Sequence, residues 1–274
     1  MDSMQVYRGM DIGTAKIGIA DQARVAHHMI DIADPGEDFS VARFQAEARA
    51  AIANIEGRGH RALLVGGTGL YVQAVIDDLQ FPGEDLAVRA RIDAHLDSSD
   101  ALAAAYSDLQ TRDPVAASRI EPGNRRRIVR AFEVMEITGR PFSSFGAGLN
   151  SGLAPVVKVR IAGLALDTAE TSTRIEARVQ AMAQRGLVDE VRTLAAAPWS
   201  RAARQAIGYK EILSFLEGEI ASVEAALELI TQRTRSFARR QRAWFRRDAR
   251  IGWCNADNKL SAPLDAVMAW WSAP

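Results

Sequence analysis

The spacing of hydrophobic positions changes several times along the chain, and each change predicts a different element. After Ser40, apolar residues recur every three or four positions, which predicts an amphipathic helix ending at Gly57 or Gly59. Residues 61–65 form a short apolar run, and Gly-Gly-Thr-Gly follows at 66–69 before the helical period returns. A strand, a glycine loop and a helix in this order predict the repeating unit of a parallel α/β sheet.

The second half of the chain is predicted to be mostly helical. Residues 85–139 have helical composition with two interruptions that each contain proline, and we interpret them as a helical insertion. The β-rich residues 156–166 predict a strand that returns the chain to the sheet. The remainder is helical apart from residues 251–254, and a long helix begins at Ser222 and ends near Arg247.

Composition indicates a globular protein of the cytoplasm. The 274 residues are 48% hydrophobic, enough for one large core or two modest ones. No stretch approaches about 20 uninterrupted apolar residues. The first residues include acid and glycine, where a signal peptide would need basic and then apolar residues, so we expect no membrane partner. The single cysteine, Cys254, excludes an internal disulfide, as is typical of a reducing compartment.

The distribution of charge is more informative than its sum. The 34 basic and 34 acidic residues cancel, so the whole chain does not indicate nucleic acid. Residues 231–250, however, contain eight arginines against the single acid Asp248, and residues 124–130 contain four more. Such clusters suit a polyanion, whereas a solvated helix face paired with acids elsewhere is an equally good interpretation.

Two segments carry candidate catalytic chemistry. Residues 2–16 place a carboxylate, a hydroxyl, an amide and two cations around two glycines. A carboxylate in such a segment can act as a general base or hold a metal, although a polar loop after a strand would look similar. Residues 66–69 follow the predicted strand, where free backbone N–H groups favour phosphate. They match neither a Walker A loop nor a Rossmann fingerprint, so a tight turn is an equally good interpretation.

Two further segments carry candidate nucleic-acid contacts. Residues 124–134 begin a predicted helix with Ile128, Phe132 and Met135 inward and arginines outward, and arginine on a rigid face suits phosphate and base contacts. Residues 234–248 interleave arginine with three aromatic side chains. This pattern is common in RNA contacts, although aromatic residues are more often core anchors.

Taken together, these segments resemble the tRNA dimethylallyltransferase (isopentenyltransferase) family over essentially the whole chain. The stretches that carry the resemblance are DSMQVYRGMDIGTAK, HHMIDI, GGTGLY, NRRRIVRAFEV, AIGYKE and RRQRAWFRRD. The resemblance implies an α/β fold, namely a P-loop-kinase-like parallel sheet with a helical insertion domain. Residues 1–81 and 151–274 would form the catalytic core with C-terminal helices, and residues 82–150 the tRNA-binding insertion.

The resemblance also implies an activity and a set of site residues. The family transfers a dimethylallyl group from dimethylallyl diphosphate to N6 of adenine 37 in tRNAs that read codons beginning with U. Asp2 matches the catalytic aspartate, which takes the amine proton, and Thr68 is a second catalytic candidate. The residues that match tRNA-contacting segments are Asp2, Ser3, Met4, Gln5, Arg126, Arg127, Ile128, Val129 and Arg130. Arg178 and Arg204 are candidates for the diphosphate, Mg²⁺ is the expected cofactor with its protein ligands unassigned, and the expected form is a monomer.

One family feature is missing from the sequence. The resemblance implies a first strand and a phosphate loop before Asp2, and the printed sequence contains neither. That loop grips a diphosphate through backbone N–H groups and a lysine, so we expect the 274 residues alone to be inactive and poorly stable. A misplaced start codon is the preferred interpretation ahead of a true truncation.

Two alternatives stay open from the sequence. The first is an RNA-binding remnant that has lost its chemistry together with the phosphate loop; an in-frame phosphate loop in the upstream DNA would exclude it. The second is an adenylate isopentenyltransferase that acts on free AMP. The arginine-rich segments argue against this second alternative, and competition between tRNA and AMP decides it.

Overall fold

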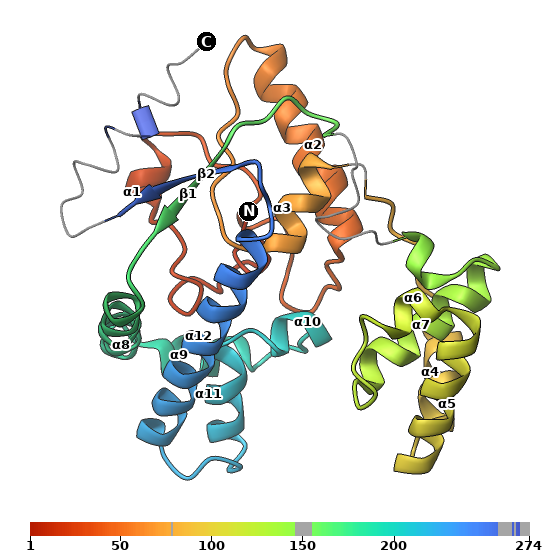
Figure 1. The fold of residues 1–274 in the computed structure, drawn as a ribbon. Coiled ribbons are helices and arrows are strands. Elements are labelled where there is room, and N and C mark those ends of the chain that lie inside the picture. Colours follow the sequence, from red (N-terminus) through yellow and green to blue (C-terminus); the bar gives the residue numbers. More distant parts are fainter. Residues whose placement is uncertain (78, 146–154, 257–264, 266, 269–274) are drawn as a thin grey trace. The chain divides into compact units, whose positions relative to one another are not determined.

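The structure is a computed structural model that divides into two compact units (Figure 1). It describes the 274 residues except 78, 146–154, 257–264, 266 and 269–274. Unit 1 comprises Met1–Ile76 with Pro155–Pro274, and unit 2 comprises Asp77–Ala154. Each unit has its own hydrophobic core. No helix among the described residues has the length and apolar character needed to cross a membrane.

Both units are mostly helical. Unit 1 contains α1 (Ile19–Gln22), α2 (Val41–Gly57), α3 (Gly69–Ile76), β1 (Ile161–Ala165), α8 (Thr168–Gln184), α9 (Leu187–Leu194), α10 (Arg201–Arg204), α11 (Tyr209–Leu216), α12 (Val223–Phe245) and β2 (Ile251–Asn255). Unit 2 contains α4 (Leu86–His95), α5 (Ser99–Arg112), α6 (Pro114–Ala117), α7 (Arg125–Thr138) and the 3₁₀ turn η1 (Phe142–Phe145).

The sheet of unit 1 is small and parallel. β1 pairs with β2 in a register that places Ile161 opposite Ile251 and Ala165 opposite Asn255. The predicted strand at 156–166 is thus shorter than expected, while the non-helical prediction for 251–254 is confirmed.

The strand predicted over residues 61–65 is wrong for this structure, since no strand is assigned there. Leu63 and Val65 are 70% and 69% exposed. A strand needs a hydrogen-bonded neighbour, and within the described residues none pairs with this segment.

Local capping explains why most helices begin and end where the sequence predicts. The Ser40 side chain accepts the Arg43 N–H at the start of α2, and Ser222 caps α12 in the same way. Gly186, with φ of +94°, follows the end of α8 in the left-handed region that favours glycine.

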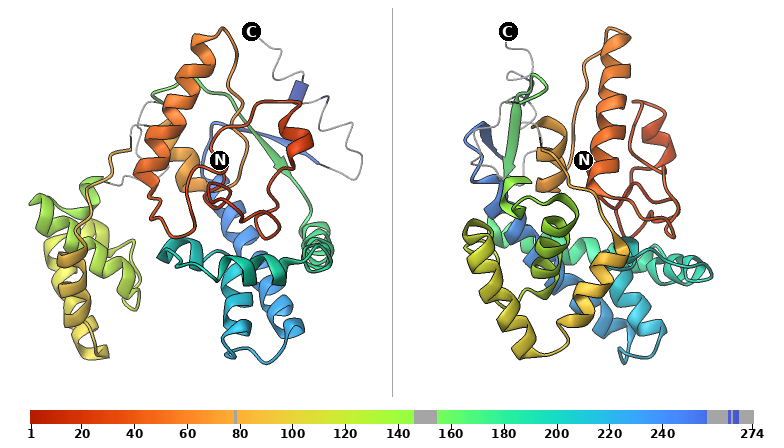
Figure 2. Two further views of the ribbon diagram at one scale, coloured as in Figure 1. Left: turned by 180° about the vertical axis from the view of Figure 1, so that it is seen from behind. Right: turned by 90° about the vertical axis from the view of Figure 1, so that its right-hand side faces the viewer.

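The core of unit 1 joins helices to the N-terminal segment. α2 buries Phe44, Ala48 and Ile52, and the Phe44 ring meets the Tyr71 ring of α3 edge-on at 4.7 Å. Tyr7 is fully buried in the same core. α12 runs beside α11 in both views of Figure 2. The N-terminal loop is thereby built into the core of unit 1 although it contains little regular structure.

Unit 2 is held by its own hydrophobic core and by the buried Glu133 carboxylate of α7. Ile128 and Met135 of α7 are buried as predicted, and Phe132 packs against them half-buried. Both predicted interruptions are confirmed, because Asp113 caps α6 and a new helix begins after Asn124.

Candidate active site

The Asp2 carboxylate closes the turn in which it lies. Its Oδ1 accepts the N–H of Met4 at 2.8 Å and that of Gln5 at 3.3 Å. No donor within the described residues reaches Oδ2, and the side chain is half-buried. One carboxylate oxygen therefore holds the turn and the other is available to accept a proton.

The glycine loop lies against this N-terminal segment. The Met1 ammonium donates to the Val65 carbonyl, and a β carbon on Gly66 would lie 2.2 Å from the Met1 carbonyl oxygen. Gly66 has φ of +154°, so both its conformation and its neighbour require glycine. The structure thus places Met1, next to Asp2 in the chain, against the loop that leads to Thr68, and a shared site for Asp2 and Thr68 stays a prediction.

α12 supports the glycine loop from another direction. Gln241 Nε2 donates to the Gly67 carbonyl at 2.8 Å, and a β carbon on Gly67 would lie 1.8 Å from that nitrogen. The Thr68 carbonyl accepts the N–H groups of Tyr71 and Val72, so Thr68 stands at the N-terminus of α3. Backbone N–H groups and a hydroxyl at a helix N-terminus favour an anion. Sequence reasoning missed Gln241, although it lies in one of the family-like stretches.

The arginines of residues 231–250 divide into those that pair with an acid and those that are exposed without an ion pair. Arg233 pairs with Glu211, and Arg235 pairs with Glu176. The exposed members that form no ion pair within the described residues are Arg239, Arg240, Arg246 and Arg247. Pairing with acids elsewhere is therefore found for the first group, and binding of a polyanion by the second group stays a prediction.

The α7 arginines divide in the same way. Arg126 is exposed, and Arg127 is exposed while donating to the Arg119 carbonyl at 3.3 Å. Arg130 donates to the carbonyls of Pro82 at 2.9 Å and Gly83 at 3.1 Å. It also pairs with Glu133 at 2.9 Å.

Two of the nine predicted tRNA-contacting residues lie in the core of unit 2. Ile128 is fully buried and Val129 nearly so. Their side chains pack in the core of unit 2 and are not on the surface that carries Arg126. Ser3 and Met4 are half-buried in the turn that Asp2 closes.

The two candidate diphosphate ligands lie on other elements. Arg178 is exposed on α8, and Arg204 at the end of α10 donates two bonds to Glu217 at 2.6 and 2.7 Å. These bonds raise the pKa of Arg204. Within the described ranges neither arginine hydrogen-bonds Asp2 or Thr68, so their role stays a prediction.

The Mg²⁺ that the resemblance implies fits the oxygens of this site. The described residues contain no group of three His, Cys, Asp or Glu side chains able to hold a metal. Mg²⁺ bound with a substrate phosphate needs one or two protein oxygens and keeps several waters. The Thr68 hydroxyl at the N-terminus of α3 is one such oxygen, and the protein ligands of the ion stay unassigned.

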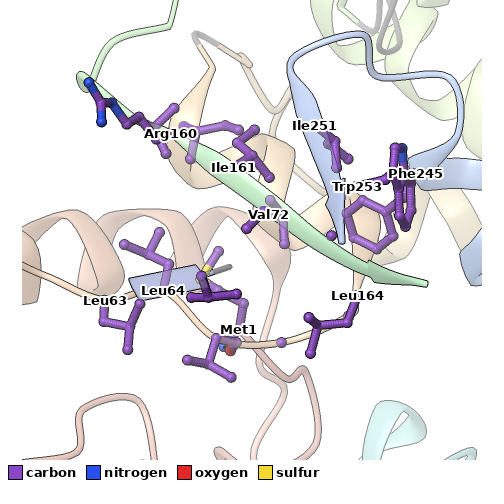
Figure 3. Close-up of a pocket in the computed structure, with 18 of the residues that line it drawn as sticks. Met1, Leu63, Leu64, Val72, Arg160, Ile161, Leu164, Phe245, Ile251 and Trp253 are labelled. Atoms are coloured by element: carbon purple, nitrogen blue, oxygen red, sulfur yellow. Dashed lines mark hydrogen bonds between the residues drawn. The ribbon is translucent and has the colours of Figure 1, made fainter. Parts of the chain in front are cut away.

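An apolar hollow of about 1100 Å³ lies beside the glycine loop in unit 1. Figure 3 shows side chains from residues 61–65 and from the two strands lining it. Its labelled lining residues are Met1, Leu63, Leu64, Val72, Arg160, Ile161, Leu164, Phe245, Ile251 and Trp253. The exposure of Leu63 and Val65 thus reflects an unfilled volume next to the predicted phosphate site.

Buried polar groups fix the rest of the N-terminal segment. The buried Lys16 donates from Nζ to the Tyr7 carbonyl at 2.7 Å, to Asp11 at 2.7 Å and to Asp31 at 2.5 Å. Glu190 of α9 binds the same loop from the other side. Lys16 lies in the segment that the sequence singled out, whereas nothing in the local sequence marks Glu190.

Comparison with known proteins matches nearly the whole chain to one family. A model of the IPP transferase family matches residues 5–248. The tRNA dimethylallyltransferase of Kineococcus radiotolerans is 48% identical over 266 residues, which are 96% of this chain and 82% of that protein. That of Salinispora arenicola is 49% identical over 257 residues, which are 93% of this chain and 73% of that protein.

Solved structures agree with the sequence comparisons. The full-length tRNA isopentenylpyrophosphate transferase of Bacillus halodurans superposes with a TM-score of 0.68 at 37% identity, covering 99% of this chain and 85% of that one. A eukaryotic dimethylallyltransferase described as acting on tRNA superposes with a TM-score of 0.75 at 25% identity, covering 97% of this chain and 70% of that one. The chain belongs to the IPP transferase family.

Proposed function

We propose that this protein transfers the dimethylallyl group of dimethylallyl diphosphate to N6 of adenine 37 in tRNAs that read codons beginning with U. Family membership supports the reaction class, and relatives named tRNA dimethylallyltransferase cover most of the chain. The observation that carries the proposal is that Met1, the chain neighbour of Asp2, contacts Val65 and Gly66 at the start of the glycine loop. A proton acceptor and an anion-binding helix N-terminus are the two groups that this transfer needs.

The chemistry follows from these two groups. The N6 lone pair attacks C1 of the allylic group, and the C1–O bond breaks with its electron pair going to the diphosphate. Asp2 Oδ2 takes the proton that N6 loses, which matters because a purine amine is a poor nucleophile. The Thr68 hydroxyl and the first N–H groups of α3 face the leaving diphosphate, with Arg178 and Arg204 as further candidates. Bound Mg²⁺ supplies positive charge against the charge that develops on the diphosphate.

The remaining expectations concern the fold, the tRNA-binding residues, the oligomeric state and the compartment that go with this function. The core would be a P-loop-kinase-like parallel sheet, and residues 82–150 would be a tRNA-binding insertion that contacts the anticodon arm. Adenine 37 leaves a single-stranded loop at low cost before reaching the base. Asp2, Ser3, Met4 and Gln5 would receive it while Arg126 and Arg127 hold phosphates. We expect a monomer that acts in the cytoplasm.

The test is prenyl transfer from labelled dimethylallyl diphosphate to an anticodon stem-loop, carried out with the chain extended upstream to the next in-frame start. Label should enter a stem-loop with adenine at position 37 and should not enter one with inosine there, because inosine lacks the N6 amine. Free AMP serves as the competing acceptor. Stem-loop binding without transfer would identify an RNA-binding protein that lacks the transferase activity. Preferential labelling of AMP would identify an adenylate prenyltransferase instead.

A further inference from the structure

A single carboxylate holds the loop that follows the Asp2 turn. Glu190 Oε2 accepts the N–H of Asp11 at 3.1 Å and of Ile12 at 2.7 Å. Its Oε1 accepts the N–H of Gly13 at 3.2 Å and the hydroxyl of Tyr209 at 2.6 Å. Four donors therefore converge on one side chain from α9, which lies more than 170 positions away in sequence from the loop.

The surroundings make this arrangement specific. A β carbon on Gly13 would lie 2.4 Å from Cε2 of Tyr209, so the loop backbone packs directly on the tyrosine ring. Burial of Tyr209, together with its bond to Glu190, raises the pKa of the phenol. The phenol thus stays protonated and donates its hydrogen to the carboxylate. Charge-assisted bonds of this kind are roughly twice as strong as neutral ones.

The loop is connected to the site by a second set of bonds. Gln5 Nε2 donates to the Thr14 carbonyl at 3.1 Å. The Thr14 hydroxyl donates to the Met10 carbonyl at 2.6 Å. This bond fixes Thr14, whose own carbonyl accepts the Gln5 side-chain amide. The Gln5 N–H in turn binds Asp2 Oδ1. A displacement of the loop is therefore transmitted to the turn that carries the proposed base.

We propose that Glu190 is a positioning residue for the transfer reaction, acting through residues 11–13 and Thr14 on the Gln5 amide and the Asp2 turn. The inference rests on the proposed function and deepens it, because it assigns a role to a residue that never touches the reactants. Its expected effect falls on the adenine side of the reaction, since Gln241 of α12 holds the glycine loop from another element. A misplacement of about 1 Å is enough to lower a rate by about 10²-fold.

Glu190→Gln is the primary test, because it keeps the size of the side chain. In the glutamine an NH₂ group replaces one of the two carboxylate oxygens, both of which accept backbone N–H groups of residues 11–13. In either orientation of the amide, this NH₂ group faces at least one of those N–H groups and cannot accept its hydrogen bond. We expect kcat/KM for the stem-loop to fall about tenfold or more, with KM for dimethylallyl diphosphate unchanged. Tyr209→Phe is the matched control: it removes one of the four bonds and should lower kcat/KM by no more than about threefold.

A second readout does not depend on turnover. A stem-loop with 2-aminopurine at position 37 reports by fluorescence whether the base is unstacked and held. The wild-type protein should change this fluorescence on binding, and Glu190→Gln should weaken the change while the stem-loop still binds. A purely structural role would lower the melting temperature and leave both readouts as in wild type well below that temperature.

The outcomes separate the inference from the function on which it rests. If wild type, extended upstream to the next in-frame start, neither unstacks the base nor transfers label, the proposed function fails and the positioning role fails with it. If wild type does both and Glu190→Gln matches it, the positioning role is wrong. Should Glu190→Gln not fold, Thr14→Val decides, because it removes only the hydroxyl bond to Met10. An unchanged kcat/KM for Thr14→Val would then overturn the proposal, and a drop of about threefold or more would support it.

Discussion

Asp2 uses its two carboxylate oxygens differently, and a single substitution separates the two uses. In Asp2→Asn the amide oxygen can still accept the N–H groups of Met4 and Gln5, so the turn is kept. The proton acceptor is lost. In a chain with its N-terminal segment restored, we expect turnover to fall by about 10²-fold or more with tRNA affinity within a few-fold of wild type.

Single-turnover transfer at saturating donor, together with stem-loop binding, measures this difference. Asp21→Asn is the control, since Asp21 is an exposed acid of the same N-terminal region. Near-wild-type single-turnover rates in Asp2→Asn would remove Asp2 from the mechanism.

The glycine loop has no room for a side chain at Gly67. In Gly67→Ala the new methyl would collide with Gln241 Nε2, and either the hydrogen bond or the loop would have to move. We expect a loss of about 1–3 kcal/mol in the free energy of unfolding and weaker binding of dimethylallyl diphosphate. Gly57→Ala, where nothing lies within 4 Å, should leave both unchanged. Denaturant unfolding and donor binding for the two variants check this, and equal behaviour would show that the loop adapts freely.

At the scale of elements, α7 combines a binding surface with an internal support. Arg126→Ala should weaken stem-loop binding and lower the slope of log affinity against log salt by about one, without changing the melting temperature. Arg130→Ala should lower the melting temperature as well, because Arg130 ties Pro82, Gly83 and Glu133 to the helix. Binding isotherms across salt and thermal unfolding separate the two. If both variants bound as wild type does, the α7 arginines would be a solvated face.

The buried carboxylate of α7 predicts a pH dependence for unit 2. Burial raises the pKa of Glu133, but bonds from Arg89, Arg130 and the Asp85 N–H outweigh it and hold the pKa below its ordinary value of 4.5. A lowered folded pKa means that the stabilisation is fully present above 4.5 and is lost as the pH falls through the folded value.

The comparison of wild type with Glu133→Gln measures this contribution. The gap between their melting temperatures should be largest near neutral pH and should narrow as the pH falls below 4.5. Glu136→Gln is the control, because Glu136 is half-exposed and pairs at the surface with Arg91. A gap that did not change with pH would mean that the Glu133 charge contributes no net stability.

The sequence predicted elements best where the cause is local. The helix starts at Ser40 and Ser222 depend on a few neighbouring residues, and both are found. A strand depends on a partner far away in sequence, which is why the apolar run at 61–65 did not predict the observed backbone. The bonds of Glu190 are non-local in the same sense. Motif resemblance predicts Asp2 and Thr68 as site residues, but only the fold shows which groups hold their backbone.

At the scale of the whole molecule, the chain leaves and re-enters unit 1 at adjacent points. The Val156 N–H donates to the Ile76 carbonyl at 2.9 Å, although the two residues flank the whole of unit 2. Each unit also has a core of its own. Insertions with neighbouring ends of this kind are removable without disturbing their host, because a short loop can close the gap.

We therefore predict that replacing residues 77–154 by a Gly-Ser linker of about three residues leaves unit 1 folded and removes most of the affinity for the anticodon stem-loop. The host keeps its core and its small sheet, whereas Arg126 and Arg127 are lost with the insertion. Circular dichroism and thermal unfolding test the first half, and stem-loop binding at low and high salt tests the second. A chain with the same linker added beside an intact insertion controls for the linker itself.

An unfolded product would show that unit 1 needs unit 2 for its stability. Unchanged affinity with an unchanged salt slope would instead place the tRNA-binding surface on unit 1, where the exposed arginines of α12 and the segment after it would be the next candidates.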